Sequence, residues 1–506
     1  MMNKIRVLAA LLAAVMLLSA LCSCGTAEEE TGTTAATTAD LPAVTEAEAE
    51  ITDDLPDDLN YNDDEIVILS RYREGWTSGE IAVEKLIGEP VNDAVFERNK
   101  AVEERLGVKL VSVEEPGDSA YNVTNKAALS VKSGTHEYDV MAAACYVSVN
   151  ESLNGILADM RQSEYIDFDK PWWSQGYNEV VEYQGAQFCG LSSALLSQYR
   201  FAFVTLFNKD LFDEAQQPYL YDAVDDGTWT LDKQFSLIPV FHQDNGNGVQ
   251  DEEDDIFGLV SCDYVSTDPY WSSCMVDIIK KNADGEYEFV FDSGKLHEVG
   301  EKVLRLFYAT DGGTYDYKME VENAEQYKIR DMFGRGGAAM ATIRILEVEN
   351  QAIRGMEQEF GVVPMPKFDE AQQEYRTLLH DQFTVFSILA TVKDDRLDEV
   401  GAVLEAMASI SYKTVRPAYY ETTLRTKIAK DPQSARMFDL IVDNIYIDAG
   451  IIYTIPLSTL HSHFREIIGS KENTVISKYK SVSGATKRDL NMICKRFERI
   501  MNKQKK

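Results

Sequence analysis

The 506-residue sequence is poor in basic residues and in cysteine. It holds 49 Lys and Arg against 84 Asp and Glu, which gives a formal net charge of −35. A chain this acidic repels polyanions at long range, so we expect no nucleic-acid partner and no docking on an anionic membrane surface. The seven cysteines include no C-x-x-C pair, which argues against a zinc knuckle or a disulfide framework. Cys262 and Cys274 either form a bridge or remain buried thiols, and we expect thiols.

Long apolar runs are also scarce. Beyond the first 21 residues no stretch approaches the roughly 20 apolar residues that a membrane-spanning helix needs. No repeat of 20 to 50 residues is visible either, which excludes a solenoid or propeller. From Asp64 onward the composition is that of a globular body large enough for two or three domains.

The N-terminus has the pattern of a secretory signal peptide. Lys4 and Arg6 precede the apolar run Val7 to Leu21. Leu21-Cys22-Ser23-Cys24 then resembles the bacterial lipobox, which implies cleavage after residue 23 and lipidation of Cys24. The alternative is ordinary cleavage near Ser23 or Gly25. The lipobox resemblance predicts a protein held at the extracellular face of the cytoplasmic membrane by acyl chains alone.

The segment 24–63 is predicted to be an acidic, disordered tether. It contains no Lys or Arg, and Tyr61 is its first aromatic residue. Such a composition cannot bury enough apolar surface to offset the entropy lost on ordering.

A βαβαβ pattern follows the tether. Apolar runs at 65–70, 108–113 and 138–144 predict strands, and the residues 119–131 predict a helix. The helix between the first two strands is expected to be capped by Asn92 or Asp93 and to end at Gly107. Parallel units of this kind bind ligands beyond the carboxyl ends of their strands. That rule points to the loops at 71–79, 114–118 and 145–150.

Several longer stretches resemble the sugar-binding group of bacterial extracellular solute-binding proteins of ABC transporters. The stretches are PVNDAVFERNKAVEERLGVKL, YDVMAA, DFDKPWWSQG, YRFAFVTLFNKDLFDE, TWTLDKQ, GRGGAAMATIRI and EFGVVPMPKFDE, in that order. The resemblance implies a two-lobed α/β periplasmic-binding-protein-like fold of type II, with parallel-rich sheets flanked by helices and an interlobe cleft that closes by hinge motion. It places the first lobe at 64–200, the second at 201–378, and a return to the first lobe with C-terminal helices at 379–506. The basic tail from Lys478 is expected to dock as a helix.

The resemblance also implies that the chain captures a carbohydrate, delivers it to ABC permease subunits and acts as a monomer. A sugar site needs flat aromatic rings for stacking and polar groups for its hydroxyls. The candidates on the corresponding segments are Trp76, Tyr146, Trp173, Tyr270, Trp271, Arg344, Tyr419 and Glu421.

The loop QDNGNGVQDEED resembles an EF-hand calcium loop, which some members of the family carry. Its ligands would be Gln243, Asn245, Asn247, Val249, Asp251 and Asp254. A Gln at the first position and a shorter Asp at the twelfth predict a weak, structural calcium site. The alternative is a solvated Asn-Gly turn.

No pattern in the sequence supports an enzyme. Ser477 and Lys480 match S-x-x-K, but the companion motifs of that enzyme class are missing from the sequence. The glycines at 334–337 precede a predicted strand instead of following one, so they do not form a dinucleotide loop. We therefore expect a binding protein without catalytic residues. The alternatives are a secreted glycan-active enzyme and a binding subunit that serves a membrane sensor.

Overall fold

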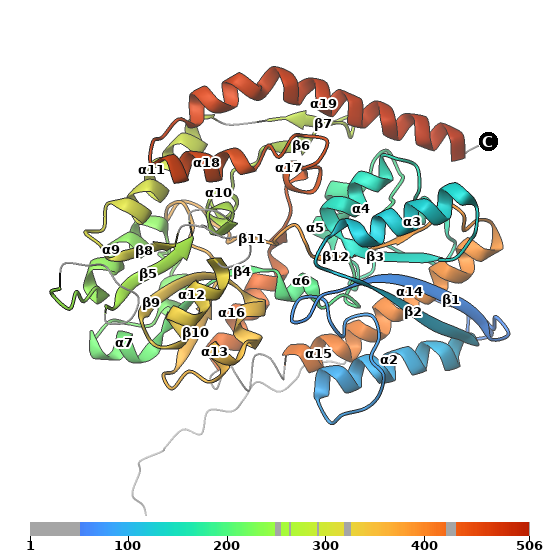
Figure 1. Ribbon diagram of the computed structural model, residues 1–506, viewed down its shortest axis with the longest axis horizontal. Helices are drawn as coiled ribbons and strands as arrows, with labels where there is room; N and C mark the ends of the chain where they lie inside the picture. Colours follow the sequence, from blue (N-terminus) through green and yellow to red (C-terminus); the bar gives the residue numbers. More distant parts are fainter. Residues whose placement is uncertain are drawn as a thin grey trace, which may run out of the picture. The chain divides into compact units, whose positions relative to one another are not determined.

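The computed structural model describes residues 51–247, 255–262, 265–290, 293–317, 325–420 and 432–504 (Figure 1). Thr52–Lys506 forms one compact unit, and within it two mixed sheets mark two α/β lobes. The two-lobed α/β architecture expected from the sequence is therefore confirmed.

The first lobe is built on a four-stranded sheet with the order β12(Thr384–Ile388)-β3(Val140–Ala144)-β1(Asp64–Tyr72)-β2(Val108–Pro116). β1 pairs in parallel with both β2 and β3, as the βαβ pattern predicts. β12 runs antiparallel against β3, and it brings the chain back from the second lobe. In Figure 1, α2 (Pro90–Leu106) lies below this sheet and α3 (Tyr121–Ser133) above it.

Helix α2 shows how local sequence sets these elements. Pro90 occupies the first turn, where its missing N–H costs nothing. The Glu89 side chain accepts the Asn92 N–H, so the cap is Glu89 and the expected cap at Asn92 or Asp93 is wrong. Gly107 ends the helix in the left-handed conformation, with φ of 60°.

The second lobe is built on a five-stranded sheet with the order β10(Phe360–Val363)-β4(Phe203–Asn208)-β9(Ala338–Arg344)-β5(Phe257–Cys262)-β8(Thr314–Tyr317). β5 runs parallel to β8 and β9, whereas β4 is antiparallel to β9 and β10. Every residue of β4, β5, β9 and β10 is buried. The sheet is therefore covered on both faces, as its continuous apolar runs require.

The remaining elements connect and cover these sheets. Those of the first lobe are α4 (Cys145–Ser152), η1 (Met160–Gln162), α5 (Gln175–Val181), α6 (Ser197–Arg200), α14 (Asp395–Lys413) and α15 (Val415–Tyr419). The others are α7 (Lys209–Glu214), α8 (Leu220–Asp225), α9 (Leu231–Phe241), η2 (Val265–Thr267), α10 (Asp268–Ser273), β6 (Ile279–Lys281), β7 (Tyr287–Phe289), α11 (Ser293–Tyr308), α12 (Glu325–Gly334), η3 (Ile345–Glu349), α13 (Gln351–Arg354), β11 (Thr377–Leu378), α16 (Pro432–Asp443), β13 (Ile445–Tyr446), α17 (Ala449–Ile452), α18 (Ser462–Ser470) and α19 (Val475–Gln504).

Two segments that cross between the lobes pair with each other. Ala202, just before β4, forms an antiparallel bridge with Leu379, just after β11. The His380 N–H donates to the Phe201 carbonyl oxygen at 3.0 Å. The outgoing and returning chains are thus held side by side, and the residues that follow each of them are fixed at the boundary between the lobes.

The folded body begins earlier than the sequence suggested. Asp53 pairs with Arg105 at 2.6 Å and accepts from the Ser409 hydroxyl at 2.6 Å, while Leu55 is buried. Residues 52–63 therefore belong to the first lobe and not to the predicted tether. The apolar and charged residues of this acidic segment follow no helical or strand periodicity, so the sequence does not indicate that the segment is folded.

The C-terminal part serves both lobes. After β12 and α14 in the first lobe, α16 and α18 pack against α8, β10, α10 and α11 of the second lobe. α19 docks as a helix, as predicted, and contacts α11 and β7 (Figure 1). Near its C-terminal end, Phe497 stacks on the first-lobe rings of Tyr183 at 5.0 Å and Phe188 at 5.8 Å.

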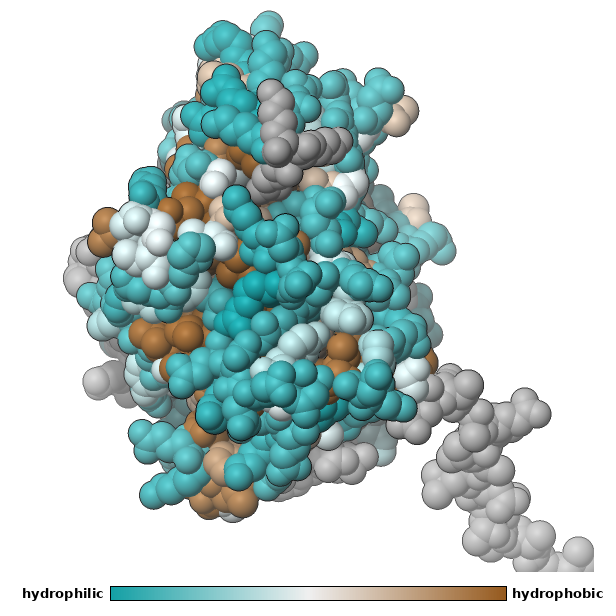
Figure 2. Space-filling view, turned by 90° about the vertical axis from the view of Figure 1, so that its right-hand side faces the viewer, coloured by the Kyte–Doolittle hydropathy of each residue, from teal (hydrophilic) through white to brown (hydrophobic). Residues whose placement is uncertain are grey.

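The surface and the thiols agree with the composition. Cys145, Cys189, Cys262, Cys274 and Cys494 are buried free thiols, which confirms the expectation for Cys262 and Cys274. In the ranges given above we find no helix with the length and apolar character needed to cross a bilayer. The face shown in Figure 2 is mostly hydrophilic, with apolar side chains in small separate groups.

We predict that Phe497→Ala lowers the free energy of unfolding by about 3–5 kcal/mol, because it removes a buried ring and leaves a cavity between α19 and the first lobe. Met492→Ala on the exposed face of the same helix is the matched control, with an expected change within about 0.5 kcal/mol. Denaturant unfolding measures both. Equal effects for the two variants would show that α19 is not docked by its Phe497 face.

Candidate functional site

The carboxyl ends of strands from both lobes meet where the crossing segments pair. β1 ends beside Arg71, and the loop that follows it carries Trp76. β9 of the second lobe ends at Arg344. We call the region where Trp76, Phe201, Arg344 and His380 come together the lobe junction.

Trp76 is the aromatic centre of the lobe junction. The guanidinium carbon of Arg344, from the second lobe, lies 4.6 Å from the centre of the indole, and that of Arg73 lies 3.4 Å from it. Phe201 and His380 meet the indole edge-on at 5.2 and 6.2 Å. An aromatic ring of one lobe thus touches a cation of the other.

The returning segment supplies the junction's titratable groups. His380 is buried and stacks on Phe201 at 5.9 Å, and its pKa is far below the usual range because burial and nearby guanidinium groups disfavour the imidazolium. Burial also raises the pKa of Asp381 to about 6, although Arg465 of α18 acts in the opposite direction. The Nε2 atom of His380 lies 3.8 Å from Oδ1 of Asp381. Burial thus keeps His380 uncharged at neutral pH and makes Asp381 a weaker acid than an exposed aspartate.

Arg71 lies deep at the end of β1. Its Nε and Nη2 atoms donate to the Gly117 carbonyl at 3.3 and 3.0 Å, and Nη2 also donates to Oε1 of Gln382 at 2.8 Å. Burial lowers the pKa of Arg71 to about 10, with the neighbouring Arg73 as the next cause. The guanidinium remains charged at neutral pH and is held by two loops of the first lobe.

Two further buried arginines of the second lobe are each paired with a carboxylate. Arg465 binds Asp268, with Nε at 2.9 Å from Oδ1. Arg344 donates to Glu347 at 2.9 Å. Burial raises the pKa of both Asp268 and Glu347, while the arginines lower it.

A cavity of about 580 Å³ opens at the carboxyl ends of β1 and β2. It is lined by the two loops that the strand-end rule predicted, namely Tyr72, Arg73, Glu74, Glu114, Glu115, Pro116, Gly117 and Asp118. Gly117 forms part of this wall and also accepts the Arg71 hydrogen bonds. Gly117 thus connects the cavity wall to the buried guanidinium of Arg71, which lies behind the lining residues.

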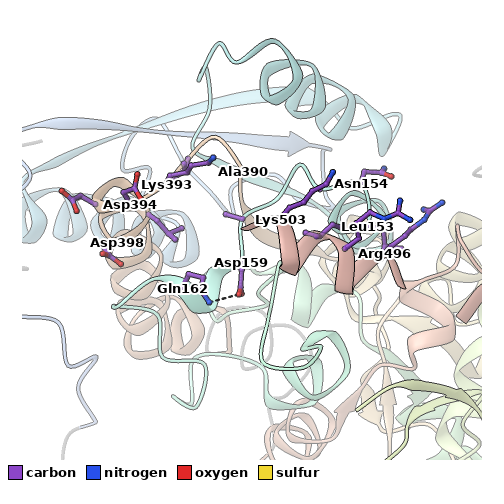
Figure 3. Close-up of a pocket in the computed structure, with 17 residues that line it drawn as sticks. Leu153, Asn154, Asp159, Gln162, Ala390, Lys393, Asp394, Asp398, Arg496 and Lys503 are labelled. Carbon is purple, nitrogen blue, oxygen red and sulfur yellow. Dashed lines mark hydrogen bonds between the residues drawn. The ribbon is translucent and has the colours of Figure 1, made fainter. Parts of the chain in front are cut away.

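A second cavity, of about 890 Å³, lies near the other ends of the strands of the first-lobe sheet (Figure 3). Its walls are the segment after β12 with Lys393, Asp394 and Asp398, the loop with Asp159, and the C-terminal turns of α19 with Arg496 and Lys503. Because β12 is antiparallel to β3, this segment lies at the amino ends of the parallel strands. The strand-end rule therefore favours the first cavity as the ligand site.

The structure brings only some of the predicted ligand residues to the lobe junction. Trp76 and Arg344 touch there. Tyr146, at the start of α4, is half-buried, and its N–H donates to the Asp381 carbonyl at 3.4 Å, so it lies beside them. Tyr419 lies further along the boundary, where its hydroxyl donates to Glu349 at 2.7 Å.

Three of the other predicted residues are core residues. The indole N–H of Trp173 donates to Glu405 at 2.8 Å inside the first lobe. The Tyr270 hydroxyl lies 2.7 Å from Oγ1 of Thr342 inside the second lobe, and Trp271 beside it is fully buried. These residues were candidates because they are aromatic. The sequence does not show whether an aromatic side chain points into the core or toward a ligand.

Several predictions fall on residues outside the described ranges. They are Glu421, Val249, Asp251, Asp254 and Cys24. Gln243, Asn245 and Asn247 are described: Gln243 bridges to Ile256, and the Asn247 N–H donates to Oδ1 of Asn245 at 2.8 Å. Within the described part of the chain no three His, Cys, Asp or Glu side chains are placed to hold a metal. The calcium site stays a prediction.

Sequence reasoning missed Arg71, His380, Asp381, Gln382 and Arg465. The loop that begins at Arg71 was predicted, and a charged residue directly after a buried strand is a signal that could have singled it out. The others could not be found in this way, because their role follows from the crossing of the chain between the lobes.

Comparison with known proteins was informative at the level of structure. No protein-family model and no curated protein sequence matches the chain. Similar solved structures include a sugar transporter protein from Rhizobium etli in an open conformation, with a TM-score of 0.55 and 14% identity over 86% of this chain and 99% of the other. The cyclic alpha-maltosyl-1,6-maltose binding protein from Arthrobacter globiformis also has a TM-score of 0.55 and 14% identity, over 87% of this chain and 99% of the other. The fold is that of the solute-binding proteins of ABC transporters.

A third neighbour with this fold is an ABC substrate-binding protein from Listeria monocytogenes, solved in complex with cycloalternan. Its TM-score is 0.51, with 15% identity over 86% of this chain and 98% of the other. Because the likenesses extend over nearly the whole of each neighbour, both lobes of the present chain correspond to theirs. At such low identity the likeness establishes the solute-binding-protein fold and leaves the ligand to be argued from the site.

The core contact of Trp173 predicts a pH dependence of stability. Glu405 is buried, accepts from Trp172 and Trp173 at 2.8 Å each, and has a pKa raised to about 7, mainly by desolvation. The folded chain binds the carboxyl proton of Glu405 more tightly than the unfolded chain does. The contribution of this proton to the free energy of unfolding is therefore fully present at pH values below the usual pKa range of glutamic acid. It is lost as the pH rises through about 7, by on the order of 3 kcal/mol.

Glu405→Gln is expected to flatten the fall in unfolding free energy between pH 5 and 8, although it destabilises the fold overall by leaving one indole N–H without a carboxylate. Glu104→Gln on the exposed face of α2 is the control and should keep the wild-type slope. Denaturant titrations followed by tryptophan fluorescence measure both slopes. An unchanged slope in Glu405→Gln would contradict the assignment.

Proposed function

We propose that this chain is a lipid-anchored extracellular solute-binding protein that captures a carbohydrate at the lobe junction and delivers it to an ABC importer. The observation that carries the proposal is the contact between Trp76 of the first lobe and Arg344 of the second, beside a strand-end cavity. A flat ring suits the CH face of a sugar, and guanidinium groups suit its hydroxyls. A ligand bound there would touch both lobes and favour their closure.

Neighbours of the same fold support the choice of carbohydrate. One was solved with cycloalternan, and another is described as a binding protein for cyclic alpha-maltosyl-1,6-maltose. The guanidinium of Arg73 stacks on the Trp76 indole at 3.4 Å, so this ring accepts a flat group on its face, and a sugar that stacks there would displace Arg73. We extend the carbohydrate class of these neighbours to the present chain.

The lipid anchor rests on the pattern at Leu21 to Cys24, in which Cys24 would carry the acyl chains. Acyl chains add about 0.8 kcal/mol of membrane affinity per buried CH₂, so a diacylated cysteine holds a protein firmly. Cys24→Ser should move the chain from the membrane fraction to the medium in a host that lipidates this motif. A variant that stays in the membrane fraction would contradict the anchor.

Calorimetric titration of the full chain with neutral and acidic oligosaccharides tests capture. We expect one class to bind and to be recovered chemically intact. Trp76→Ala should weaken binding at least tenfold, about 1.4 kcal/mol. Phe235→Ala is the matched control, because Phe235 also carries an arginine, Arg305, at 4.5 Å but lies on α9 away from the strand ends.

Two outcomes would contradict the proposal. Consumption of the bound sugar would favour a glycan-active enzyme. Equal losses in Trp76→Ala and Phe235→Ala would place the ligand elsewhere than at the lobe junction.

A further inference from the structure

The surroundings of Arg71 indicate the charge of the captured sugar, an inference that rests on the proposed function. Arg71 is 3% exposed, and the three hydrogen bonds of its guanidinium go to a backbone carbonyl and to the Gln382 amide oxygen. None of these partners is a carboxylate. Its third nitrogen, Nη1, is buried and has no hydrogen-bond partner among the described residues.

The other buried arginines nearby show that the fold can supply a carboxylate where it needs one. Arg465 has Asp268, and Arg344 has Glu347. Glu80, the buried acid on the loop after β1, is instead engaged by the Thr384 hydroxyl and by the Ser197 N–H at 3.0 Å. Arg71 thus differs from Arg465 and Arg344 in lacking a bonded carboxylate. Arg98 of α2 lacks one too, but each of its guanidinium nitrogens has a hydrogen-bond acceptor, whereas Nη1 of Arg71 has none among the described residues.

A second orphan polar group lies on the segment that holds Arg71. His380 is 8% exposed, and its Nδ1 atom has no partner among the described residues. It is two residues from Gln382, which holds Arg71, and the charge of Arg71 is among those that depress the pKa of His380. Two buried side chains therefore present unused hydrogen-bonding atoms at the lobe junction.

We propose that Arg71 receives a carboxylate of the ligand, so that the captured carbohydrate is an acidic saccharide that contains uronic acid. A buried polar group without a partner is costly, and the planar guanidinium fork matches a carboxylate better than it matches a single hydroxyl. A ligand carboxylate on Nη1 supplies the missing acceptor and a directly bonded countercharge together, in addition to the more distant charges of Glu80 and Asp381. The uncharged imidazole of His380 offers a further hydrogen bond to the same sugar.

The negative charges of the carboxylates around the strand-end cavity act less strongly on a ligand than the positive charge of Arg71 does. Glu74, Glu114 and Asp118 are exposed, and Glu115 is bound by Lys126, so water and a partner screen their charges. Arg71 is buried, and its charge acts through a medium of low dielectric constant. The exposed acids remain available to sugar hydroxyls at the rim.

The test is a set of calorimetric titrations of the full chain with trisaccharides of galacturonate, glucuronate and mannuronate, each beside the neutral trisaccharide of the same linkage. We expect at least one acidic member to bind 30-fold or more tighter than its neutral counterpart. Neutral binding that equals or exceeds acidic binding overturns this inference and leaves sugar capture standing. Binding of no saccharide overturns the proposed function itself.

Variants then assign the preference to Arg71. Arg71→Gln should bring the acidic-to-neutral ratio close to one, while Arg71→Lys, which keeps the charge and loses the fork, should retain part of it. Arg436→Gln, an exposed arginine paired with Asp225 on the second lobe, is the matched control and should keep the wild-type ratio. A wild-type ratio in Arg71→Gln would overturn the assignment, and the wild-type titrations decide the ligand class even if that variant fails to fold.

Discussion

The pairing of the two crossing segments is the constraint on which the site depends. One hydrogen bond from His380 to Phe201 and one bridge between Ala202 and Leu379 join chains that are nearly 180 residues apart in sequence. The ends of β1 and β9, which belong to different sheets, both lie beside this pairing: Trp76 of the loop after β1 meets Phe201, and Ile345 after β9 donates its N–H to the Ala202 carbonyl. Trp76 of one lobe and Arg344 of the other then make a non-covalent contact.

Burial governs the chemistry of that place. The lobe junction keeps His380 uncharged and raises the pKa of Asp381, while three guanidinium groups stay ionised because arginine resists deprotonation. The fold balances two of these cations with carboxylates of its own and leaves the third, Arg71, with neutral partners only. The overall charge of −35 repels an anionic ligand at long range, so recognition of a carboxylate depends on this buried cation at short range.

Periodicity predicted the first lobe well because its strands and helices are local and regular. The run at 65–70 and the glycine at 107 identify their elements with little help from tertiary contacts. The candidate site was predictable only in part: the strand-end rule indicated the loop that carries Trp76, and the family resemblance indicated the segment that carries Arg344, and the two side chains touch. Trp173 and Tyr270 are buried with internal hydrogen bonds, and an aromatic residue near a cleft segment looks the same in sequence whether it faces a core or a ligand. His380 and Arg465 depend on contacts between distant segments, and a single sequence carries no trace of these contacts.

The central claim is that a sugar bound at the lobe junction holds both lobes, and a distance between the lobes tests it most directly. Spin labels at Leu129→Cys on α3 and Val240→Cys on α9 use two exposed positions, and the described native cysteines are buried. With Cys22 and Cys24 changed to Ser, pulsed electron paramagnetic resonance gives the distance distribution with and without sugar. The account predicts that saturating sugar narrows the distribution to a single distance. An identical distribution with the sugar demonstrably bound would contradict it.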